Sequence, residues 1–79
     1  MAEKYSDSEL VEKVHQPGWA IDTGGDGRPV TGTLAEVAKA AHAEHAKGTW
    51  RGLVREIETE VEVDMIQLSM LWRYLGLPT

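Results

Sequence analysis

The sequence contains no cysteine and no phenylalanine. Without cysteine, no disulfide can stabilise the fold, and no thiolate can bind a metal ion or act as a nucleophile. Without phenylalanine, the core must depend on three tryptophans, two tyrosines and the aliphatic residues around them. A chain of 79 residues lies near the lower end of what folds alone, so we expect one small domain over 1–79.

Long apolar runs and basic residues are also scarce. No stretch approaches the roughly 20 apolar residues that cross a bilayer, and the first residues do not resemble a signal peptide. We therefore expect a soluble, cytoplasmic protein without a membrane partner. The 8 Lys and Arg residues are outnumbered by 13 Asp and Glu residues, which gives a formal net charge of -5. This charge repels phosphate backbones and argues against nucleic acid as a partner.

Three segments begin with the residue pattern of a capping box, in which two residues three positions apart bond each other's backbone amides. The pairs are Ser6 with Glu9, Thr33 with Glu36, and Asp64 with Gln67. The first pair predicts a helix over 7–15, which Pro17 and Gly18 end. The second pair predicts a helix over 34–47, which ends before Gly48.

The third helix, which follows Asp64, is apolar on almost every side. Gly76 fits a left-handed C-cap, and Pro78 ends the helix. Its apolar residues form two faces, with Met65, Leu68, Trp72 and Leu75 on one and Ile66, Met70 and Tyr74 on the other. A helix of this kind must be buried on several sides, either within its own domain or against a partner.

The segment after the first helix has the features of a reversal. Trp19 and Ile21 alternate with small or polar residues, and a Gly-rich stretch follows them. This pattern predicts a short hairpin or a loop. Pro29 cannot donate a ladder hydrogen bond, so a second strand beside it would lie at the edge of a sheet.

The segment 49–63 decides the fold class. Its apolar residues match a helical stripe that begins at Trp50, yet acidic and β-branched residues alternate strictly over 56–63, as in a half-buried strand. We favour the helix because the stripe starts early and Glu has good helix propensity. The sequence thus predicts a mainly α fold, a compact bundle of about four short helices with a Gly-rich hairpin or loop after the first. The alternative is an α+β fold with a small sheet from 19–31 and 56–63.

No catalytic motif is present, so we expect a protein that is not an enzyme and needs no cofactor. His42 and His45 lie one turn apart on the second predicted helix and are the candidate metal ligands. A stable site would need a third ligand, and the HExxH pattern of zinc proteases is absent. We expect no bound metal and keep a His-based metal-binding accessory protein as one alternative function.

Residues 33–41 resemble the first helix of the helix-turn-helix in the lac repressor family. In that family a glycine and a short turn follow the last alanine, whereas here His42 follows and the helical pattern continues to Lys47. The resemblance implies a recognition helix over 49–61, which carries two arginines but also three glutamates. Because those acids would face phosphates unfavourably, a DNA-binding transcription regulator is a second alternative.

The preferred function is that of a non-enzymatic protein–protein interaction module or small regulatory subunit. Its apolar contact residues would be Ile66, Met70 and Tyr74, since Met and Tyr suit adaptable or amphipathic contacts. An acidic face made of Glu56, Glu58, Glu60 and Glu62 would set the electrostatic preference for a partner. The partner would be a second copy, which gives a homodimer, or another protein.

Overall fold

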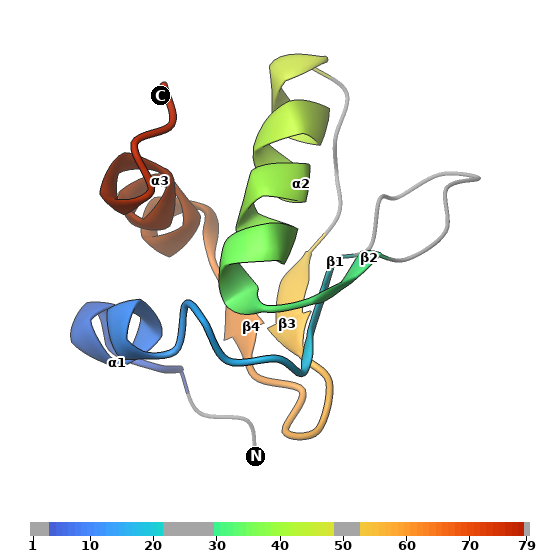
Figure 1. Cartoon of the computed structure of the whole chain (residues 1–79), viewed down its shortest axis with the longest axis vertical. Helices are drawn as coiled ribbons and strands as arrows, with labels where there is room; N and C mark the ends of the chain where they lie inside the picture. Colours follow the sequence, from blue (N-terminus) through green and yellow to red (C-terminus); the bar gives the residue numbers. More distant parts are fainter. Residues whose placement is uncertain (1–3, 22–29, 49–52, 79) are drawn as a thin grey trace.

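A computed structural model describes residues 4–21, 30–48 and 53–78 of the chain. The elements follow the order α1 (Asp7–Glu12), β1 (Trp19–Ile21), β2 (Val30–Gly32), α2 (Leu34–Ala46), β3 (Val54–Glu56), β4 (Glu62–Val63) and α3 (Met65–Tyr74). The strands form one antiparallel sheet in the order β2-β1-β3-β4. Helix α2 lies across one face of this sheet, and α1 and α3 pack against each other beside it (Figure 1).

The predicted mainly α bundle is therefore wrong, and the chain has an α+β fold. The predicted helix over 49–63 is replaced, in its described part, by the hairpin of β3 and β4, in which Val54 pairs with Val63. Both valines are buried. On a helix, residues nine positions apart would lie on opposite sides, so only the hairpin brings these two into one core.

The alternative α+β prediction has the correct class, but 56–63 is not a single strand. The amide of Glu60 donates to the carbonyl oxygen of Glu56 at 2.9 Å, and the amide of Glu56 donates to the carbonyl oxygen of Val61 at 2.9 Å. Glu60 adopts a left-handed conformation with φ of 61°. The alternating segment therefore contains a tight turn. The sequence does not indicate this turn, because residues 57–60 include none of the Gly, Asn or Pro residues that usually mark one.

Of the two structures predicted after the first helix, a hairpin or a loop, β1 and β2 form the antiparallel pair of a hairpin. Their register places Trp19 opposite Gly32 and Ile21 opposite Val30. Strand β2 is an edge strand, as predicted from the neighbouring proline. Residues 22–29, including Pro29 itself, lie outside the described part of the chain.

The capping boxes of α1 and α2 are confirmed in both directions. Helix α1 nevertheless ends at Glu12, three residues before its predicted end. The reason is that the carbonyl oxygens of Val14 and Gln16 accept the first amides of α2, those of Ala35 at 2.8 Å and Leu34 at 3.2 Å. These carbonyls satisfy donors that a helix start leaves unpaired, and so fix α2 against the end of α1.

Helix α3 has half of the predicted capping box. Asp64 accepts the amide of Gln67 at 2.8 Å, but the Gln67 side chain donates to the carbonyl oxygen of Tyr5 at 2.7 Å. The C-terminal end is confirmed: Gly76 has φ of 79°. The amide of Leu77 donates to the carbonyl oxygen of Trp72 at 2.8 Å, which completes a Schellman motif.

The core lies between the helices and one face of the sheet. Its members are Leu10 and Val14 before α2, Trp19 and Ile21 on β1, Leu34, Ala35, Val37, Ala38 and Ala41 on α2, Val54 and Val63 on the hairpin, and Leu68, Leu71 and Trp72 on α3. The alanines of α2 let α3 approach closely, so that the indole Nε1 of Trp72 donates to the carbonyl oxygen of Ala38 at 2.8 Å. This bond fixes the position of the Trp72 indole against α2.

Candidate functional site

Helix α3 buries one side and exposes the other. Leu68, Leu71 and Trp72 point into the core, whereas Ile66 is 83% exposed and Tyr74 is 56% exposed. We define the outer α3 face as Met65, Ile66, Met70, Arg73 and Tyr74. An exposed isoleucine between two other exposed apolar side chains is an unfavourable arrangement in water, and it marks a candidate contact surface.

The sequence leaves open whether α3 is fully internal. The helix is not fully internal, because its outer face is exposed within this domain. Two of the three predicted contact residues, Ile66 and Tyr74, are on that face and accessible. The third, Met70, is half-buried and packs against the core, so only part of its side chain is accessible on this face.

The predicted acidic row does not form one continuous face. Glu58 and Glu60 lie in the turn between β3 and β4, and Glu62 is an exposed residue of β4 opposite Arg55. Glu56 is half-buried, and its Oε1 atom accepts hydrogen bonds from the hydroxyls of Tyr5 and Thr59. The turn divides the row, because strict alternation along a strand cannot continue through a chain reversal.

Glu56 is held in its ionised form by its neighbours. Burial opposes ionisation, but the hydrogen bonds from Thr59 and Tyr5 outweigh it and lower the pKa of this carboxyl. The same bond to Glu56 raises the pKa of the Tyr5 hydroxyl. The Tyr5 hydroxyl and the Glu56 carboxylate are therefore hydrogen-bonded to each other within the fold.

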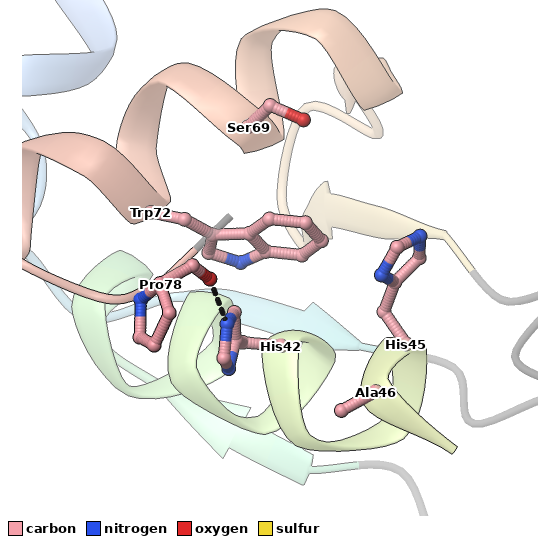
Figure 2. Close-up of a pocket in the computed structure, with 6 residues that line it drawn as sticks. All are labelled: His42, His45, Ala46, Ser69, Trp72 and Pro78. Atoms are coloured by element: carbon pink, nitrogen blue, oxygen red, sulfur yellow. Dashed lines mark hydrogen bonds between the residues drawn. The ribbon is translucent and has the colours of Figure 1, made fainter. Parts of the chain in front are cut away.

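A pocket of about 430 Å³ opens between the C-terminal half of α2 and the middle of α3. It is lined by His42, His45 and Ala46 of α2, Ser69 and Trp72 of α3, and Pro78 of the C-terminal segment. Figure 2 shows the indole of Trp72 with the two imidazoles on its α2 side. None of these six residues carries a carboxylate, and the lining that they form is mostly apolar.

The two histidines contact the indole rather than each other. The ring of His42 stands edge-on to Trp72 with centroids 5.2 Å apart, and the ring of His45 is tilted with centroids 5.1 Å apart. Nε2 of His42 is hydrogen-bonded to the carbonyl oxygen of Pro78 (Figure 2). No cluster of three or more His, Asp or Glu side chains suited to a metal ion occurs among residues 4–21, 30–48 and 53–78.

The helix-turn-helix interpretation loses the element on which it depended. In the described part of the predicted recognition helix, Val54–Glu56 is strand β3 and the residues after it form a turn. Arg55 is a strand residue that lies 3.9 Å from Glu60, from its Nη1 to the Oε1 of the glutamate. Residues 49–52, with Arg51, lie outside the described part of the chain.

The sequence did not predict the pocket. A tryptophan on α3 and two histidines one turn apart on α2 were visible, but nothing in the sequence showed that these two helices pack together there. The direct sign of this packing is the hydrogen bond from Trp72 to the backbone of Ala38. Such a side chain-to-backbone bond has no sequence signature.

Together these features define a small α+β domain with an exposed apolar helix face and an adjoining pocket with an aromatic floor. No known protein family matches the chain, and no characterised protein or solved structure is similar enough to identify it further. Across the described segments, no helix has both the length and the apolar character needed to cross a membrane.

Proposed function

We propose that this protein is a non-enzymatic interaction domain that associates with a second copy of itself through the outer α3 face. The observation that carries this proposal is the 83% exposure of Ile66 on a helix whose other side is buried. Burial of a large aliphatic side chain is worth roughly 1.5–3 kcal/mol, so covering this face is favourable.

The outer α3 face is complementary to itself when two copies pack antiparallel. A two-fold axis between Ser69 and Met70 would place Met65 opposite the second copy's Tyr74, and Ile66 opposite its Arg73. A methionine against a tyrosine ring is a favourable contact. A surface that pairs with itself in this way is what a two-fold symmetric dimer requires.

The charges on this surface also favour the antiparallel arrangement. Exposed Arg73 lies near the C-terminal end of α3, and Glu62 and Asp64 lie directly before its N-terminal end. Antiparallel packing brings the arginine of one copy toward the acids of the other, whereas parallel packing would bring the two arginines together. Helix α3 has 10 residues and spans only about 15 Å, so we expect a weak, reversible dimer.

Sedimentation equilibrium over a wide concentration range tests the proposal. The wild-type chain should show a reversible monomer–dimer equilibrium, and Ile66→Asp should shift it strongly to monomer. Ile57→Asp is the matched control, because Ile57 is also exposed, at 50%, but lies in the turn after β3. A wild-type chain that stays monomeric throughout, or equal dissociation by both variants, would contradict the proposal.

The orientation of the helices has its own test. Arg73→Glu should weaken the dimer, because it places like charges together, and adding Glu62→Lys to the same chain should restore association. If the double variant associates no better than Arg73→Glu alone, the antiparallel arrangement is wrong even where the dimer itself exists.

A further inference from the structure

We infer that the pocket between α2 and α3 is a binding site for a small planar aromatic molecule. The pocket has a volume of about 430 Å³. Sites for small molecules typically measure about 300–1,000 Å³ and combine an apolar lining with few polar groups. This pocket lies in that range and has that character.

The aromatic character of the lining determines the class of ligand. Three of the six lining residues, His42, His45 and Trp72, carry aromatic rings, and Pro78 adds a fourth ring at the rim. Aromatic rings attract one another in edge-to-face and offset arrangements beyond the effect of area alone. The two imidazoles already make such contacts with Trp72, which is itself 2% exposed, so a further flat ring would join this set through the imidazoles.

A hydrogen bond within the fold holds the His42 ring at the pocket. A carbonyl oxygen only accepts, so Nε2 of His42 donates to Pro78. His45 is exposed and supplies a second imidazole beside the pocket. An indole fits this lining, because it combines two flat aromatic rings with little polar surface.

The floor of the site is fixed before any ligand arrives. Trp72 is 2% exposed, and its Nε1 atom is bonded to the backbone of α2 at 2.8 Å. The ring is therefore held by the packing of two helices and by the bond to Ala38. A preformed site of this kind loses little conformational freedom on binding.

Titration of the full chain with indole, followed by ¹H–¹⁵N NMR, tests this inference. The backbone amides of His45 and Ser69 and the indole N–H of Trp72 should shift together along one saturable curve. Cyclohexanol is the matched probe, since it has a donor and a ring but no aromatic face. Equal binding of cyclohexanol, or no saturable shift with indole, would overturn the aromatic assignment.

Substitutions at two alanines of α2 test whether indole binds in the pocket. Ala46→Phe should fill the pocket and weaken indole binding by at least about tenfold. Ala43→Phe adds the same ring to an exposed position of α2 outside the lining and should leave binding unchanged. Ser69→Leu blocks the pocket from α3 and serves as the second variant if Ala46→Phe loses helicity. Unchanged binding in a folded blocking variant would place the indole elsewhere and refute the site.

The site is independent of the dimer. Arg73→Glu should leave indole binding intact, because Arg73 does not line the pocket. A wild-type chain that binds indole but stays monomeric at all concentrations would therefore contradict the dimer alone.

Discussion

The hydroxyl of Tyr5 donates a hydrogen bond to the carboxylate of Glu56, 51 residues further along the chain. The same tyrosine lies against Trp19 with ring centroids 6.0 Å apart, and its carbonyl oxygen accepts the side-chain amide of Gln67. Tyr5, which precedes α1, thus contacts β1, β3 and α3. In a small chain without disulfides, this convergence links the N-terminal segment to both layers of the fold.

Replacing Tyr5 with Phe removes this hydroxyl and leaves the ring in place. We expect Tyr5→Phe to lower the free energy of unfolding by about 1 kcal/mol, because it deletes one hydrogen bond to a charged acceptor. For a chain of this size that loss corresponds to a decrease in Tm of roughly 4–8 °C. Tyr74→Phe is the control, since the Tyr74 ring is exposed on α3. Equal effects in thermal unfolding would show that the bond to Glu56 contributes nothing.

Two carboxyl groups should make the fold sensitive to acid. The pKa of Glu56 is lowered because the bonds from Thr59 and Tyr5 outweigh burial, and hydrogen bonds from Lys4 and the amide of Gln67 lower that of Asp64. A folded-state pKa below the ordinary value means that the ionised group stabilises the fold at higher pH. That stabilisation is lost as the pH falls through the folded-state pKa.

Urea unfolding should therefore show lower stability at about pH 3 than at neutral pH. The decline should begin as the pH falls below the ordinary carboxyl values of 4.5 for Glu and 3.8 for Asp. Glu56→Gln should be less stable than the wild type at neutral pH and should lose less stability on acidification. If acid weakens both chains equally, the interactions of Glu56 are not the cause.

The sequence predicts the helices of this fold better than its strands, and the reason is physical. A capping box and a Schellman motif involve residues within one turn, so Thr33 with Glu36 and Gly76 with Leu77 can be recognised locally. The pairing of Val54 with Val63 depends on whether the chain reverses between them. That reversal uses Glu60 in a left-handed conformation, which its residue type does not suggest.

The candidate site was only partly predictable for the same reason. Helical periodicity places Ile66 and Tyr74 on the same side of α3, so these two residues could be grouped from the sequence. Which side of α3 would be exposed depended on its contacts with α1 and α2, and those are tertiary. The pocket depends on His42 and Trp72 meeting across two helices, for which the chain carries no local sign.

The two buried tryptophans offer a matched comparison. Nε1 of Trp72 donates to Ala38, whereas Nε1 of Trp19 has no hydrogen-bond partner among the residues that the structure describes. Each Trp→Phe change removes similar packing, but only Trp72→Phe also breaks a hydrogen bond. We expect Trp72→Phe to cost about 1 kcal/mol more than Trp19→Phe in urea unfolding, since the latter deletes an unsatisfied buried donor. The reverse order would show that packing differences outweigh the hydrogen bond.

The left-handed conformation of Glu60 leads to a prediction of increased stability. A residue with a Cβ atom is strained at φ of 61°, by roughly 1 kcal/mol, whereas glycine adopts this conformation freely. Glu60→Gly should therefore raise the free energy of unfolding by up to about 1 kcal/mol, less the greater freedom that glycine gives the unfolded chain. The lost ion pair with Arg55 is long and exposed, so it offsets little of this gain.

Glu58→Gly is the control in the same turn, because its φ is not positive and glycine there only adds freedom to the unfolded chain. Urea unfolding should show the two substitutions acting in opposite directions, and destabilisation by both would mean that the turn at Glu60 carries no strain.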